Sequence, residues 1–144
     1  MTGAAWSSGL RFFLDRGLGS KVLPAALRQA GWQLETMDER YGKAESQVVP
    51  DAKWIQDATI NGDVILCKDL KIASNPLEAQ VVFMTSARVF GLANAQLTGP
   101  KMVNWYLRRE AEIVEMAQRV EGPFVASVHA AQRLRRVRLA YPPA

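Results

Sequence analysis

The amino-acid sequence predicts an α/β fold built on a mainly parallel sheet, and three observations support this class. Short apolar runs of strand length alternate with longer segments whose apolar residues recur at helical spacing. A strand, a helix and a second strand follow one another within residues 12–36, and such a βαβ unit implies a parallel pair of strands. The run Asp63–Cys67 is almost continuously apolar, which is typical of a strand buried in a parallel sheet.

Glycine and proline delimit most of the predicted elements. The predicted strands are residues 12–14, 32–36, 63–67, 87–92 and 124–128, and the predicted helices are residues 20–30, 52–60, 76–85 and 101–120. Residues 76–85 are assigned to a helix because Pro76 suits a first turn, although Val81–Phe83 also fits a strand. The polar stretch 37–49 is predicted to be a loop, and residues 133–139 form an edge-like last segment.

The length of 144 residues, with 49% hydrophobic and 22% charged residues, indicates one domain. We expect this domain to span residues 10–139, between a flexible leader at 1–9 and a tail at 140–144. The formal net charge of +4 arises entirely from residues 101–144, which contain 8 basic and 4 acidic residues. A basic C-terminal region beside a neutral remainder favours the binding of a polyanion or an acidic partner. It is also consistent with an ordinary solvated surface.

The single cysteine and the single histidine limit the available chemistry. Cys67 lies within an apolar run, so a buried structural thiol is expected and an internal disulfide is excluded. His129 alone excludes a histidine-cluster zinc site and argues against histidine acid–base catalysis. The N-terminal residues lack the pattern of a signal peptide, and no apolar run approaches the roughly 20 residues that span a bilayer. We therefore expect a cytoplasmic protein that does not associate with membranes.

Several acidic residues fall where the topology predicts a common edge of the sheet. Asp15 ends the first strand, Asp69 follows the third, and Asp51 begins the helix that leads back to the third strand. A helix antiparallel to its next strand places its first residue beside the end of that strand, so these aspartates are expected to converge. Asp38 and Glu39, just after the second strand, reach the same edge.

Converging carboxylates indicate a cation site because like charges repel unless a cation neutralises them. Hard oxygen ligands suit Mg²⁺ or Mn²⁺. One or two such ions orient a phosphodiester, activate a water and stabilise the leaving oxygen. The basic C-terminal segment then offers a place for the remaining nucleic-acid backbone. Together these features outline a metal-dependent nuclease.

Each acid also has a purely structural interpretation. Asp51 fits a helix cap, Asp69 fits a turn after a strand, and Asp15 fits a surface ion pair. Asp38 and Glu39 lie in a polar stretch where acidic side chains are usually solvated. Taken singly, the structural interpretations are favoured, whereas the placement of all these acids at one edge favours the cation site.

The segments Phe13–Leu18, Pro50–Ile55 and Gly62–Asp69, in this order and spacing, resemble the PIN-like domain family. They are most similar to the branch that includes relatives of VapC toxins. The run Ala87–Leu97, the long helix after it and the arginine-rich end are also similar to this branch. The resemblance therefore spans roughly residues 10–139. One difference is that Cys67-Lys68 stands where family members carry a Thr-Arg-like pair before the last aspartate.

The resemblance implies a three-layer α/β/α sandwich and a Mg²⁺- or Mn²⁺-dependent endoribonuclease, the toxin of a type II toxin–antitoxin pair. It also implies that Asp15, Asp51 and Asp69 are catalytic metal ligands. Many relatives carry a glutamate in a helix between the first two of these positions. This chain has only Asp38 and Glu39 there, and these are therefore the candidates for a fourth ligand.

Basic and aromatic residues supply candidate contacts with partners. Arg16 and Lys68 are candidate contacts with RNA phosphate, or else solvated charges. The expected partners are the RNA substrate, a cognate antitoxin protein and a second copy in a homodimer; exposed Trp54, Trp105 or Tyr106 would serve the protein contacts. The alternative function is a degenerate PIN-like module that binds RNA or a partner protein without catalysis.

Overall fold

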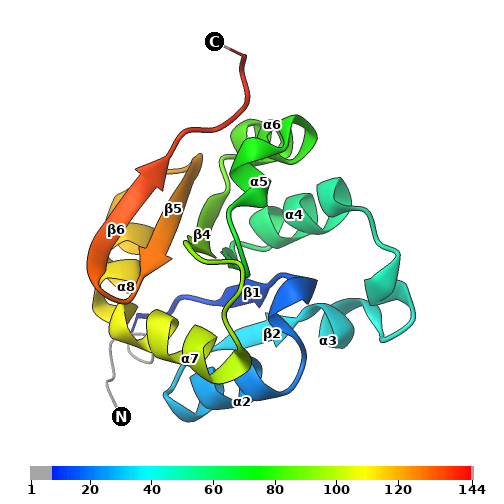
Figure 1. Ribbon diagram of the computed structural model, residues 1–144. Coiled ribbons are helices and arrows are strands. Elements are labelled where there is room, and N and C mark those ends of the chain that lie inside the picture. The colour runs from blue at the N-terminus through cyan, green and yellow to red at the C-terminus, as the bar shows by residue number, and fades with distance from the viewer. Residues whose placement is uncertain (1–7, 144) are drawn as a thin grey trace.

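A computed structural model describes residues 8–143 and contains one six-stranded sheet (Figure 1). Its strands are β1 (Phe12–Leu14), β2 (Leu34–Thr36), β3 (Val64–Cys67), β4 (Arg88–Leu92), β5 (Phe124–His129) and β6 (Gln132–Val137). They lie in the order β2-β1-β3-β4-β5-β6, and every neighbouring pair is parallel except β5 and β6. The predicted α/β fold with a mainly parallel sheet is confirmed. The first seven residues of the predicted leader, and residue 144 of the predicted tail, lie outside the described residues.

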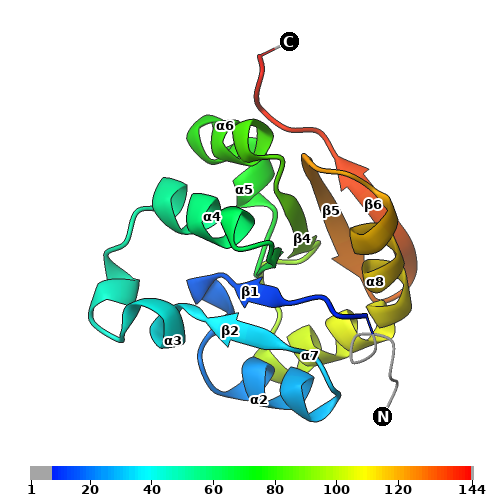
Figure 2. The same cartoon turned by 180° about the vertical axis from the view of Figure 1, so that it is seen from behind.

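Helices cover both faces of the sheet, which gives the predicted three-layer α/β/α arrangement (Figures 1 and 2). One face carries α2 (Val22–Gln29), α7 (Gly99–Arg108) and α8 (Glu110–Arg119). The other face carries α3 (Met37–Tyr41), α4 (Asp51–Ile60), α5 (Lys71–Ser74) and α6 (Pro76–Thr85). Two short 3-10 helices, η1 (Arg16–Leu18) and η2 (Glu45–Gln47), lie in the connections.

Alternation along the strands divides the core into two clusters. In β1, Phe12 and Leu14 pack toward α2 and α7, whereas Phe13 packs toward α4. All three side chains are buried, as expected for a strand that has a neighbour on each side and helices on both faces. Asp15 directly follows this buried strand, and it therefore lies at the carboxyl edge of the sheet.

The stretch 37–49, predicted as a loop, instead contains α3 and η2. A capping box begins α3, in which the Thr36 hydroxyl accepts from the Glu39 N–H and the Glu39 carboxylate accepts from the Thr36 N–H. The prediction was wrong because the polar composition of this stretch hid the capping pattern. Asp38 and Glu39 therefore lie on a helix rather than in the predicted loop.

The single helix predicted over residues 101–120 is also corrected, because it is divided into α7 and α8 at Arg109. The backbone of Arg109 leaves the helical region, with φ of −104° and ψ of 12°. Its guanidinium donates to the carbonyl oxygens of His129 and Ala130 at 3.0 and 2.6 Å. The break between the two helices therefore coincides with hydrogen bonds from Arg109 to the β5–β6 turn. Helical periodicity in the sequence does not reveal such a contact.

The aromatic residues considered for partner contacts lie mostly inside the protein. Trp54 and Tyr106 are buried, so neither is available to a partner, and Trp105 is only half-buried against the core. Cys67 is buried as predicted. Within the described residues, no helix has both the length and the apolar character needed to cross a membrane.

Candidate acidic active site

Asp15 enters the site directly from the end of β1. Its backbone N–H donates to the Leu66 carbonyl at 2.9 Å, which continues the pairing of β1 with β3. Its Oδ1 accepts from the Gly17 N–H at 3.1 Å and so caps η1. The glycine-containing turn that follows the strand thus orients the carboxylate at the edge of the sheet.

Asp51 is the first residue of α4, directly after Pro50. Its Oδ1 accepts from the indole Nε1 of Trp54 at 2.8 Å and from Arg16 Nη1 at 3.3 Å. Its side chain does not cap the helix, so the structural interpretation as an N-cap does not apply. The buried ring of Trp54 instead holds this carboxylate in place from within the same helix.

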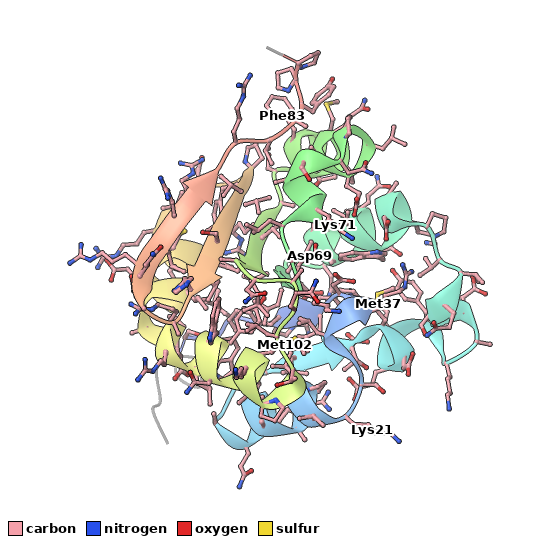
Figure 3. The ribbon with its side chains drawn as sticks, in the orientation of Figure 1. Lys21, Met37, Asp69, Lys71, Phe83 and Met102 are labelled. Carbon is pink, nitrogen blue, oxygen red and sulfur yellow. The ribbon has the colours of Figure 1, made fainter. Side chains whose placement is uncertain are left out.

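Asp69 follows β3, and its Oδ1 accepts from the Lys71 N–H at 2.9 Å (Figure 3). This hydrogen bond is the one expected if Asp69 is a turn residue, and it also orients the Asp69 side chain. The Asp69 carbonyl lies against Gly91 of β4, where a Cβ atom would come within 2.3 Å of it. A glycine at this position is therefore required for the close approach of the Asp69 turn to the sheet.

Asp51 and Asp69 lie close enough to Asp15 to affect its ionisation. Burial raises the pKa of Asp15 above its ordinary value, the hydrogen bond from Gly17 opposes this shift, and the charges of Asp69 and Asp51 add to it. Negative charge thus accumulates at this edge, since no described cation fully offsets it there. The convergence of Asp15, Asp51 and Asp69 agrees with the geometry expected from the topology.

Glu78, which the sequence analysis did not consider, belongs to the same group. It lies in the first turn of α6, where its backbone N–H donates to the Asn75 side chain at 3.2 Å. Burial, followed by the charges of Asp51, Asp15 and Asp69, raises the pKa of Glu78 to about 7. The topological argument that placed Asp51 at this edge also applies to Glu78, because α6 begins beside the same edge and leads back to β4.

Asp38 and Glu39 are engaged elsewhere. The Asp38 carboxylate accepts from the Ser46 hydroxyl. Glu39 accepts from Arg28 at 2.6 Å, and this hydrogen bond lowers the pKa of Glu39. Neither residue is among the charges that raise the pKa of Asp15 or Glu78. As positioned, Glu78 rather than either of these residues accompanies the three aspartates.

The two candidate phosphate-binding residues lie beside the acids. Arg16 donates to the carbonyl oxygens of Ser46 and Val49 at 3.1 and 2.8 Å, in addition to Asp51. It thereby joins the turn after β1 to the segment that leads into α4. Lys68 is half-buried against Gly17, where a Cβ atom would lie 3.1 Å from the Cβ of Lys68.

The donor atoms at this edge fit a hard divalent cation. Each aspartate of the group uses Oδ1 for its hydrogen bonds, and Oδ2 accepts none from the described residues. These second oxygens are the ligand type that Mg²⁺ and Mn²⁺ prefer. Among the described residues, no three acidic, histidine or cysteine side chains form an arrangement ready to hold an ion.

These features define an α/β/α protein with a carboxylate cluster at the carboxyl ends of β1 and β3. A family model described as "PIN like domain" matches residues 10–94, and the chain belongs to the PIN-like domain family. A Mycobacterium tuberculosis protein named "Putative ribonuclease VapC45" is 37% identical over 123 residues, which cover 85% of this chain and 88% of that protein. No solved structure gives a significant match.

Proposed function

We propose that this protein is a Mg²⁺- or Mn²⁺-dependent endoribonuclease of the VapC type that acts in the cytoplasm. Family membership and the name of the M. tuberculosis relative support a nuclease with an RNA substrate. The observation that carries the proposal is the placement of Asp15, Asp51 and Asp69 at two neighbouring strand ends and a helix start on one edge of the sheet, with Glu78 in the first turn of α6, because clustered carboxylates suit a hard divalent cation.

In the proposed mechanism, Asp15, Asp51 and Asp69 would hold the cation, with Glu78 as the fourth carboxylate. A bound divalent ion would supply neutralisation of the phosphate charge and activation of the attacking water. Trp54 and the backbone N–H groups of Gly17 and Lys71 keep the three aspartates oriented. Arg16 keeps the segment before α4 in place so that Asp51 faces the site.

The first prediction concerns RNA cleavage in Mg²⁺ or Mn²⁺ by wild type, Asp51→Asn and Glu78→Gln. Loss of one carboxylate should lower the rate by about 100-fold, because the cation contributes several kcal/mol of transition-state stabilisation. The matched control is Glu39→Gln, which removes an acid engaged with Arg28 and should leave the rate within about threefold. Equal, metal-independent cleavage by wild type and Asp51→Asn would refute the mechanism.

The alternative, a degenerate module that binds RNA or a protein without catalysis, is favoured by one contact. Arg16 already partly neutralises Asp51 through an ion pair of 3.3 Å. RNA binding that weakens with salt, combined with no cleavage by wild type in any divalent ion, would support this alternative.

We also propose a cognate antitoxin protein as a partner. The N-terminal end of α6 is next to the acidic group, and this helix exposes Leu77 and Met84 at 75% and 67%. An apolar segment of an antitoxin would cover this face and block access to Glu78; a second copy of the chain is the other candidate occupant. Co-expression with the product of a neighbouring small gene should suppress cleavage, whereas dimerisation of the isolated chain would favour the homodimer.

A further inference from the structure

Four exposed arginines gather on and just beyond β6: Arg133, Arg135, Arg136 and Arg138, referred to as the β6 arginines. None of them forms an ion pair with another described residue. Arg11, Arg16, Arg28 and Arg40, in contrast, each pair with a carboxylate. The β6 arginines are thus an uncompensated positive strip on one element.

Two carboxylates that border this strip are engaged elsewhere. Glu112 and Glu115 of α8 border the same groove as Arg133. Glu112 pairs with Arg109 at 2.6 Å, and Glu115 lies 3.9 Å from Arg119. The positive charge of Arg133 is therefore left without a direct acidic partner at this surface.

The edge position of β6 makes the strip accessible along its length. The strand pairs only with β5, with Arg135 opposite Ser127 and Arg136 opposite Ala126. Arg136 rests over the ring of Phe124, 5.8 Å from its centroid, and donates to the Pro123 carbonyl at 3.4 Å. Successive residues of a strand point to opposite faces, so Arg135 and Arg136 flank the exposed edge of β6 from its two faces, and alternate residues lie about 7 Å apart.

The strip begins at the edge that carries the acidic group. Because β6 is antiparallel to β5, Gln132 lies opposite His129 at the carboxyl end of β5. Strand β6 is separated from β3 by β4 and β5, which is about 14 Å at the usual strand spacing. Figure 3 shows side chains that end in nitrogen projecting outward from this side of the sheet. A polyanion that leaves the acidic group across β4 and β5 would meet β6 next.

The chemistry of the strip favours a nucleic-acid backbone over a protein. Arginine forks bind phosphate through paired charge-assisted hydrogen bonds. Protein interfaces usually have an apolar centre, yet the exposed large apolar residues of the described chain include none on α7, α8, β5 or β6. Without a cation, the acidic group repels phosphate, so metal-free affinity for RNA has to come from another surface.

We propose that the β6 arginines bind the phosphate backbone of single-stranded RNA and hold it across the sheet edge toward the acidic group. This inference rests on the proposed function for its choice of substrate. The binding itself requires no metal ion, so it can be measured separately from cleavage.

The test measures the affinity of the full chain for a single-stranded RNA in EDTA over a range of salt concentrations. The variant changes all four β6 arginines to Gln. Its control is Lys21→Gln, Lys43→Gln, Lys101→Gln and Arg108→Gln, which removes the same charge from exposed residues that form no ion pair with described residues. Thermal unfolding checks that both variants are folded.

We expect the β6 variant to lose at least about tenfold in affinity and to show a salt slope that is smaller by roughly 3. The control should stay within about threefold of wild type. Equal losses in the two variants, or no loss in the β6 variant, would overturn the proposal. Unchanged RNA binding with lost binding of an acidic protein partner would overturn it in favour of that partner. A wild type that binds RNA through β6 but never cleaves it would instead count against the proposed function alone.

Discussion

At the scale of single residues, the ionisation of Glu78 links the acidic group to stability. Its pKa, about 7, lies above the ordinary value of 4.5 because burial and three neighbouring aspartates disfavour its charge. The folded state therefore holds this proton more tightly than the unfolded state does. The resulting stabilisation is fully present below about pH 4.5 and is lost as the pH rises through about 7.

The prediction for Glu78→Gln is a flatter dependence of stability on pH. Without metal, wild type should lose stability between pH 4.5 and 7 more steeply than this variant does, because the variant lacks the Glu78 carboxyl, whose raised pKa lies in this range. Denaturant unfolding in EDTA at several pH values measures the difference. Parallel curves for the two proteins would show that Glu78 does not share the electrostatic field of the aspartates.

Gly91 is the second residue at which a small substitution should have a large effect. Its lack of a side chain allows the turn at Asp69 to lie against β4. Gly91→Ala should cost about 1–3 kcal/mol by overpacking, and should lower cleavage by at least about tenfold by displacing Asp69. Gly62→Ala is the control, because its φ of 84° is strained for alanine while a Cβ atom there meets no neighbour within 4 Å. Similar loss of cleavage in both variants would contradict a specific role for Gly91.

At the scale of elements, α3 joins the first three strands, and its Arg40 reaches Asp63 at the end of β3 opposite the acidic group. Arg40 pairs with Glu35 of β2 and with buried Asp63, both at 2.7 Å, and its guanidinium lies 4.1 Å from the centroid of the Phe13 ring. Arg11 adds a longer contact to Asp63, at 3.5 Å. This network stabilises the sheet and lies away from the cleavage chemistry.

Removal of Asp63 should therefore reduce stability without impairing the site. Asp63→Ala is expected to cost about 3 kcal/mol, because it leaves the mostly buried Arg40 without its buried partner. Glu115→Ala, which breaks an exposed pair with Arg119, should cost less than about 1 kcal/mol. Unfolding measurements give both values, and the cleavage rate at a temperature where both variants are folded should match wild type.

At the scale of the whole molecule, the proposed cation site predicts that a divalent ion stabilises the fold, because it would neutralise the clustered carboxylates. Mn²⁺ at about 100 times its dissociation constant should add about 2.7 kcal/mol, which raises Tm by roughly 5–10 °C. Asp51→Asn retains an acceptor for Trp54 but loses one charge, so its Tm should respond far less to Mn²⁺. A wild-type Tm that is insensitive to Mn²⁺ and Mg²⁺ would argue for the degenerate module.

Much of the architecture is predictable from local sequence because strands, turns and helix starts have local signals. Helix 76–85 is correct to its end residues, and the burial of Cys67 follows from its apolar run. The break at Arg109 is not predictable in this way, since it accompanies contacts with carbonyl groups twenty residues further along the chain. Helix α3 was missed although its capping box is a local signal.

The sequence by itself determined the order of strands and helices, and hence which residues stand at strand ends and helix starts. That order was sufficient to bring Asp15, Asp51 and Asp69 to one edge. Only the tertiary structure showed which other carboxylate lies near them, because Glu39 pairs with Arg28, whereas burial and the charges of the three aspartates raise the pKa of Glu78. The physical reason is that the pKa of Glu78 depends on its distances in space from the three aspartates. These distances are set only when α4 and α6 pack side by side on the sheet.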